Sequence, residues 1–197
     1  ANFGLGFEFW PQERVREHCK TEKYFDGVFS PHDFQFNSLR YLRGLAEAVA
    51  AKGGKIFEGS AAVKVERSGG WTVHTAAGKV RARHVVICGA VYMRGIDRRL
   101  ENATFPVQTY MMSTAPVAEA LLEKSINTRH AINDTRFCGD YYRRLPDNRI
   151  LWGGRVGLWA HPQNIADAML QDMLKVYPQL AGHVTPETAW SGLMAYA

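Results

Sequence analysis

The side chains best suited to chemistry lie in one stretch of the sequence, residues 131–155. Two of its segments, Tyr141–Leu145 and Ile150–Arg155, are rich in aromatic, aliphatic and arginine residues. Between them lies Pro146-Asp147-Asn148, in which proline presets the first turn residue and asparagine tolerates a left-handed backbone. The pattern predicts a β-hairpin.

Strand side chains alternate between the two faces of a sheet, so this hairpin presents two different surfaces. Tyr142 and Arg144 share one face, and Tyr141, Arg143 and Leu145 share the other. A face that carries both tyrosine and arginine could cover a flat aromatic cofactor and also hold an anionic or polar substrate. The alternative is an amphipathic hairpin whose arginines only face water.

Composition places the chain among ordinary globular proteins. Of its 197 residues, 46% are hydrophobic and 22% are charged. No apolar run approaches the roughly 18 residues of a membrane-spanning helix, so we expect no membrane segment. Cys19, Cys88 and Cys138 are odd in number and far apart, which favours free thiols in a reducing, cytoplasmic compartment.

The net charge of +5 raises the question of a nucleic-acid partner, which the sequence does not support. Its arginines are dispersed, without a basic block or a zinc-finger, helix-turn-helix or RNA-recognition signature. The histidines lack paired metal-ligand spacing, and no serine lies in a Gly-x-Ser-x-Gly turn. We therefore expect no nucleic acid, no metal and no hydrolase triad, while the basic surface could match a cofactor's phosphates.

Hydrophobic periodicity predicts an α+β fold with at least one mixed or antiparallel sheet. Amphipathic helices are expected over 39–51 and 164–177, a short helix follows Pro11, and Gly27–Pro31 is expected to be a loop. The predicted strands outside the hairpin are Lys55–Phe57, Ala62–Glu66, Trp71–Thr75, Lys79–Ala82, Val85–Cys88, Val107–Ser113 and one beginning at Ala189. Because Val85–Cys88 is apolar at successive positions, that strand is expected to be buried on both faces.

Several segments together resemble a known family. Residues 37–46, 53–59 and 83–90 resemble the D-amino-acid-oxidase superfamily of FAD-dependent oxidoreductases. Asp134-Thr135-Arg136, residues 141–147 and Gly153-Gly154-Arg155 resemble its gamma-glutamylputrescine-oxidase-like and glycine-oxidase-like branch. The resemblance spans nearly the whole chain, in the right order and at the right spacing.

The resemblance implies a domain organisation. Residues 1–36 would be a substrate-domain or linker segment, 37–105 part of an FAD-binding domain, 106–189 the substrate-binding domain, and 190–197 the start of the return to the FAD domain. The family begins with a Gly-x-Gly-x-x-Gly phosphate turn and ends with a glycine-rich flavin segment, and this sequence contains neither. We therefore expect the central part of a flavoenzyme, which does not retain FAD by itself and whose exposed apolar surface favours self-association.

The resemblance also implies site residues and a reaction. The positions implied for FAD binding are Ala62, Gly89 and Ala90. Those implied for catalysis are Tyr141, Tyr142 and Arg155, whereas Arg149 in the turn is expected to be solvated and silent when replaced. The expected reaction is hydride transfer to FAD from the carbon beside the nitrogen of a small amine or amino acid, then imine hydrolysis and reoxidation by dioxygen. The alternative of another class is a non-catalytic β-rich binding or assembly module.

Overall fold

The computed structural model describes residues 4, 6–93, 95–157 and 163–196 of a chain that divides into two compact units. Unit 1 comprises Ala1–Gln35 and Gln108–Gly192, and unit 2 comprises Phe36–Val107 and Leu193–Ala197. Two stretches that are distant in sequence therefore build unit 1 together. None of the described helices is long and apolar enough to cross a membrane.

Unit 1 is organised around a five-stranded sheet with the strand order β10-β6-β9-β8-β7. Its strands are β6 (Phe105–Thr114), β7 (Ile132–Asn133), β8 (Tyr141–Arg144), β9 (Ile150–Gly157) and β10 (Pro186–Tyr196). The predicted hairpin is confirmed as β8 and β9, and Asn148 in its turn has a φ of 64°. The register is antiparallel for the β6–β9, β7–β8 and β8–β9 pairs, which confirms the predicted α+β class.

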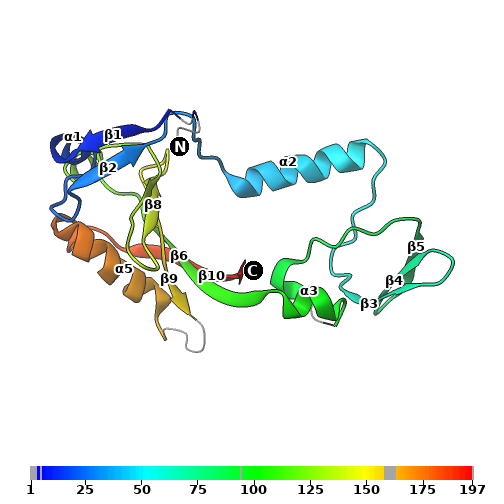
Figure 1. Ribbon diagram of the computed structural model, residues 1–197. Coiled ribbons are helices and arrows are strands. Elements are labelled where there is room, and N and C mark those ends of the chain that lie inside the picture. Colours follow the sequence, from blue (N-terminus) through cyan, green and yellow to red (C-terminus); the bar gives the residue numbers. More distant parts are fainter. Residues whose placement is uncertain (1–3, 5, 94, 158–162, 197) are drawn as a thin grey trace. The chain divides into compact units, whose positions relative to one another are not determined.

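One face of this sheet is covered by the helix α5 (Ile165–Val176), which runs along β9 (Figure 1). Met169, Met173 and Val176 of α5 are buried at helical spacing, as their pattern predicts. From the sheet they meet Trp152 and Tyr110, which have almost no exposed surface. The short helices α4 (Glu119–Glu123) and η2 (Pro178–Leu180) close the same core. Burial of each such side chain contributes roughly 1.5–3 kcal/mol.

The N-terminal part of unit 1 differs from the prediction. It forms a two-stranded sheet of β1 (Glu8–Pro11) and β2 (Asp26–Phe29), joined through the helix α1 (Gln12–His18). The expected loop at Gly27–Pro31 is thus wrong for its first residues, which pair with β1. The strands are four residues each, too short for a clear alternating pattern, and α1 lies between them in the sequence.

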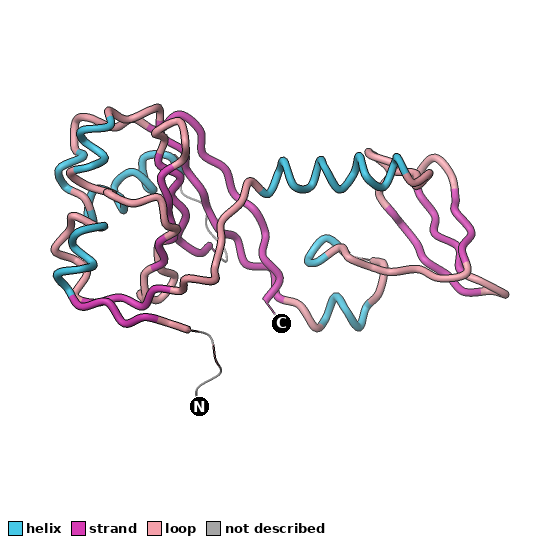
Figure 2. The backbone as a smooth tube through the Cα atoms, turned by 90° about the horizontal axis from the view of Figure 1, so that it is seen from above, coloured by secondary structure: helices cyan, strands magenta, loops and turns pink. Residues whose placement is uncertain are grey.

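Unit 2 contains the helix α2 (Ser38–Ala51) and a three-stranded antiparallel sheet of β3 (Ala62–Arg67), β4 (Trp71–Thr75) and β5 (Lys79–Ala82). These elements confirm the predicted helix and three of the predicted strands. Helix α2 is a straight rod (Figure 2), capped where the side chain of Asn37 accepts a hydrogen bond from the backbone of Arg40 at 3.0 Å. The helices η1 (Ala90–Tyr92) and α3 (Arg98–Asn102) complete the unit.

Two predicted strands of unit 2 are absent from the described residues. Lys55–Phe57 and Val85–Cys88 have no strand conformation, and the side chain of Val86 is 83% exposed. An apolar run becomes a buried strand only when neighbouring strands pair with it and other layers cover it. No described strand pairs with residues 84–89, so the expectation of burial on both faces was wrong for this structure.

Candidate active site

The five-stranded sheet has one packed face and one more open face, and the two tyrosines of β8 lie on opposite sides of it. Tyr142 and Arg144 are buried, whereas Tyr141 and Arg143 are half-buried. This alternation is the one predicted from the sequence. The packed face is the one against α5, so Tyr141 belongs to the open face.

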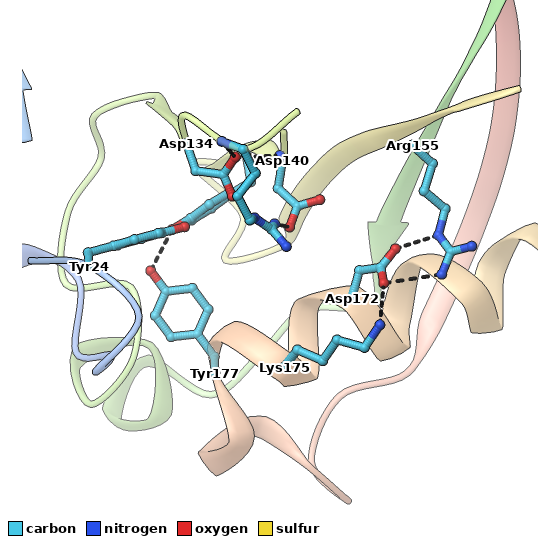
Figure 3. Close-up of polar contacts among 9 residues, drawn as sticks. Tyr24, Asp134, Asp140, Arg155, Asp172, Lys175 and Tyr177 are labelled. Carbon is cyan, nitrogen blue, oxygen red and sulfur yellow. Dashed lines mark hydrogen bonds and ion pairs between the residues drawn. The ribbon is translucent and has the colours of Figure 1, made fainter. Parts of the chain in front are cut away.

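Tyr142 is a core residue. Its side chain is 3% exposed and its ring stacks on Trp152 with centroids 4.1 Å apart. Its hydroxyl lies 2.9 Å from the hydroxyl of Tyr24 and 2.7 Å from that of Tyr177 (Figure 3 shows both partners). Burial, the largest cause, holds the pKa of Tyr142 well above its usual value, so the hydroxyl stays protonated. Tyr142 therefore packs in the core of unit 1.

Tyr141 lies on the open face, directly over a glycine of the neighbouring strand. It pairs with Gly153, where any side chain would collide with the Tyr141 ring and with the sulfur of Met111. Glycine is therefore the residue that lets the ring lie flat against the sheet. Burial raises the pKa of Tyr141, although its hydrogen bond with Thr109 acts in the opposite direction. The hydroxyl is thus a neutral, oriented group at neutral pH.

Arg155 occupies a bulge in β9. Gly154 pairs with Tyr110 and Val156 pairs with Thr109, so Arg155 is the extra residue between them. Its φ of 54° is a left-handed conformation that costs a non-glycine residue about 1–3 kcal/mol. The bulge turns the side chain away from the regular alternation.

The redirected guanidinium binds the helix that covers the sheet. Nη2 of Arg155 lies 3.1 Å from Oδ1 of Asp172, and Nε contacts Oδ2 of the same carboxylate, in a fork (Figure 3). Lys175 reaches the same carboxylate at 3.0 Å. Burial alone would raise the pKa of Asp172, but the hydrogen bonds from Arg155 and Lys175 outweigh it and the pKa is lowered.

Two further acidic residues, Asp134 and Asp140, lie close together where β8 begins. Asp134 and Asp140 are both bound by Arg136, and the backbone N–H of Asp140 donates to Oδ1 of Asp134 at 3.1 Å. Asp140 is 4% exposed, and burial raises its pKa despite the neighbouring Arg136. Any side chain at Gly154 would collide with this carboxylate.

Sequence reasoning missed these acids. Asp134 is part of the family-like motif Asp134-Thr135-Arg136, whereas the sequence patterns single out neither Asp140 nor Asp172. Asp172 lies three residues after Met169 and four before Val176, both buried on α5. A carboxylate at helical spacing from a buried stripe lies at the border of the packed face, and this was the signal that could have found it.

The residues implied for FAD binding lie in unit 2. Ala62 begins β3, an edge strand whose outer backbone groups have no strand neighbour among the described residues, so a planar base could pair there. Gly89 and Ala90 lead into η1, where Ala90 has a φ of 46° and is exposed. Gly89 is fixed by packing, since a Cβ there would lie 2.7 Å from Cγ of Met93. Exposed backbone with little side chain fits a close approach to FAD.

The sequence matches a protein family described as FAD dependent oxidoreductase, over residues 1–197. The chain belongs to this family. Among its curated relatives, Probable oxidoreductase OrdL of Haemophilus influenzae is 29% identical over 97% of this chain and 45% of its own length. Gamma-glutamylputrescine oxidoreductase of Escherichia coli is 28% identical over 90% of this chain and 42% of its own length. The chain thus spans less than half the length of these curated relatives.

Solved structures share the fold of this chain. Glycine oxidase from Geobacillus kaustophilus superimposes with a TM-score of 0.76 at 18% identity, over 98% of this chain and 53% of that one. L-proline dehydrogenase from P. horikoshii gives a TM-score of 0.79 at 14% identity, over 100% of this chain and 54% of that one. At such identities the likeness establishes the fold. The resemblance drawn from the sequence motifs is confirmed.

Proposed function

We propose that the intact protein oxidises the C–N bond of a small amine or amino acid with FAD as its cofactor. The observation that carries this proposal is Tyr141, a neutral, oriented tyrosine on the open face of the sheet in an FAD-dependent oxidoreductase. Compounds with an amine nitrogen appear in the names of its relatives, namely gamma-glutamylputrescine, glycine and proline.

The cofactor and the chain have separate tasks in this proposal. When bound, FAD would supply the acceptor for the hydride of the carbon beside the nitrogen, with dioxygen as the final electron acceptor and water hydrolysing the imine product. The backbone at Ala62, Gly89 and Ala90 would hold the cofactor, because little side chain lies in the way there. Tyr141 orients the substrate, since its protonated hydroxyl can donate one hydrogen bond and accept others.

Arg155 and Tyr142 support this arrangement. The fork between Arg155 and Asp172 fixes the β9 bulge against α5, two residues beyond the glycine under the Tyr141 ring. Arg155 is therefore proposed as a positioning residue, because its guanidinium is engaged by a carboxylate of the chain. Tyr142 is assigned to the core, because its hydroxyl is already engaged by two tyrosines of the chain that are buried or half-buried.

The proposal is tested with the intact gene product and a panel of amines and amino acids. Oxygen consumption that requires an amine, with one aldehyde or keto acid formed per oxygen used, is the expected result. An intact protein that binds FAD but oxidises no amine or amino acid in the panel would contradict the proposed substrate class. A protein that binds no flavin would favour the non-catalytic binding module instead.

A further inference from the structure

Unit 1 contains a pocket that the proposed reaction does not use. It has a volume of about 410 Å³ and lies between the N-terminal β1–α1–β2 segment and residues 128–135. This volume is within the range of small-molecule sites. Tyr141, Arg155 and the residues proposed for FAD do not line it.

One wall of this pocket is an ordered aromatic stack. The ring of Trp10 stacks with those of His18 and Phe29, with centroid distances of 4.7 and 4.6 Å and interplanar angles of 22° and 19°. His130 packs edge-on against Phe29 at 4.9 Å. Since Trp10 is only 8% exposed, the stack is fixed before any ligand arrives. Such a wall favours a flat ring.

A second feature of the pocket is that a chain of hydrogen bonds between tyrosine hydroxyls ends at one of its lining residues, Tyr24. The Tyr142 hydroxyl donates to the Tyr24 hydroxyl at 2.9 Å, which uses its only hydrogen. In the 2.7 Å contact between Tyr142 and Tyr177, Tyr177 must therefore be the donor. The chain runs in one direction, from Tyr177 through Tyr142 to Tyr24, which lines the pocket.

In this direction the hydrogen of the Tyr24 hydroxyl is not used within the chain of three tyrosines. Among the described residues no group accepts a hydrogen bond from the Tyr24 hydroxyl, although it accepts one itself. Burial raises the pKa of Tyr24, so it remains a protonated donor at neutral pH. A donor that itself accepts a hydrogen bond from a chain of donors is polarised by it and binds an acceptor more strongly.

The charges around the pocket favour a neutral ligand. Lys23 and Asp26 line it with opposite charges, and the carboxylate of Asp134 is bound by Arg136. The described lining thus has no surplus of positive charge to attract an anion. We propose that this pocket binds a neutral, planar aromatic molecule through its ring, against Phe29 and His130 of the aromatic wall, and through an oxygen acceptor that receives the Tyr24 hydrogen.

The test uses three fluorinated probes of one size and ¹⁹F NMR on the intact gene product. The probes are 4-fluorobenzamide, which carries a neutral acceptor, 4-fluorotoluene, which has none, and 4-fluorobenzoate, which is anionic. We expect 4-fluorobenzamide to bind roughly threefold to tenfold more tightly than 4-fluorotoluene, as one neutral hydrogen bond allows. Benzoate should bind no better than toluene.

Two variants, Tyr24→Phe and His130→Ala, test whether the probes bind in this pocket. Tyr24→Phe removes only the donor, so the preference for benzamide over toluene should disappear, whereas Tyr41→Phe, at an exposed tyrosine of α2, should leave it unchanged. His130→Ala, at an exposed position of the wall, should weaken both probes without unfolding the protein. Absence of wild-type binding, or an unchanged benzamide preference in a folded Tyr24→Phe variant, would overturn the proposal. If Tyr24→Phe does not fold, unchanged binding to His130→Ala has the same meaning.

Discussion

Neighbouring residues of β8 have opposite environments, and this decides which tyrosine is a candidate for catalysis. Tyr141 lies on the open face over Gly153, and Tyr142 lies in the core on Trp152. Their sequence, Tyr-Tyr, does not distinguish them, because either register would alternate correctly. The position of α5 on one face is what assigns the roles.

Replacement of each tyrosine by phenylalanine should therefore have different consequences. Tyr141→Phe should lower kcat/KM for the amine by roughly twofold to tenfold, with FAD content unchanged, because one neutral hydrogen bond is lost. Tyr142→Phe should instead lower the free energy of unfolding by about 1–2 kcal/mol, since it interrupts a buried hydroxyl chain. Steady-state kinetics and urea unfolding of both variants, with Tyr41→Phe as control, separate the two. Equal kinetic defects in both would contradict the assignment of faces.

A variant of Asp172, the partner of Arg155, distinguishes a positioning role of Arg155 from direct binding of the substrate. Arg155→Ala is expected to lower kcat/KM by roughly tenfold to a hundredfold while FAD content stays near normal. If Arg155 acts by positioning, Asp172→Asn should produce a similar defect, and the double variant should be little worse than either single one. If Arg155 bound the substrate directly, loss of Asp172 would leave it available and the defects would differ.

Arg149 is not the solvated turn residue expected from the sequence. It bonds the backbone oxygen of Thr114 at 3.2 Å and forms ion pairs with Asp147 and Glu187. Its replacement is therefore unsuitable as a silent control. The expectation was wrong because the turn packs against the ends of β6 and β10, a long-range contact that local sequence does not reveal.

Among the elements, the β9 strand is the one whose glycines shape the site. Gly153→Ala should destabilise the protein by about 1–3 kcal/mol and displace the Tyr141 ring, because the new methyl group meets both that ring and Met111. Thermal unfolding and kinetics should both show the loss. Gly192→Ala, also in a strand but with no heavy atom within 4 Å of the added Cβ, is the matched control and should be nearly neutral in stability.

The contact between β9 and α5 should make stability depend on pH in a definite direction. The pKa of Asp172 is lowered in the folded chain, so its contribution is complete above the usual aspartate pKa and is lost as the pH falls through the lowered value. Asp172→Asn should cost about 1–2 kcal/mol at about pH 6, less than a fully buried pair because the Arg155 side chain is 39% exposed. The difference from wild type should shrink by about pH 3 in urea unfolding. A difference that is constant with pH would contradict the ion pair.

Local sequence patterns predicted the helices and strands whose periodicity and turn residues lie within the element itself. The β8–β9 hairpin, α2, α5 and the β3–β4–β5 meander were all evident from periodicity and turn residues. The bulge at Arg155 was not, because it depends on how β9 pairs with β6, and the β6 partners at the bulge lie over 40 positions away in the sequence. Of the candidate site, the tyrosine pair and its alternation between the two faces could be predicted. The assignment of Tyr141 to the open face, the acids Asp140 and Asp172, and the direction of Arg155 required the tertiary packing.

At the scale of the whole molecule, unit 2 exposes apolar side chains that an amphipathic helix normally buries. Leu39, Leu42, Leu45 and Val49 of α2 are each at least 45% exposed. The 197-residue chain by itself should therefore self-associate, and Leu42→Gln should reduce this association without loss of helix content. Sedimentation velocity at several concentrations measures it. A chain that stays monomeric at all concentrations would contradict the prediction.

The same chain by itself should not retain FAD. The sequence lacks a Gly-x-Gly-x-x-Gly turn, which concentrates contacts to phosphate in dinucleotide-binding folds. The residues proposed for FAD binding, Ala62, Gly89 and Ala90, would supply only backbone groups. The purified 197-residue chain should be colourless and should not quench the fluorescence of added FAD. Binding at micromolar FAD would show that the described residues form a sufficient site.

The central claim is that the intact protein uses FAD to oxidise a C–N bond, and anaerobic flavin bleaching tests it most directly. The intact gene product, purified with its cofactor, is mixed without oxygen with single amines and amino acids while the flavin absorbance is followed. We predict bleaching by at least one amine or amino acid, slower in Tyr141→Phe than in Tyr41→Phe, and recovery of the colour when oxygen is admitted. A flavin that no amine or amino acid bleaches, or one bleached equally fast in both variants, would contradict the account.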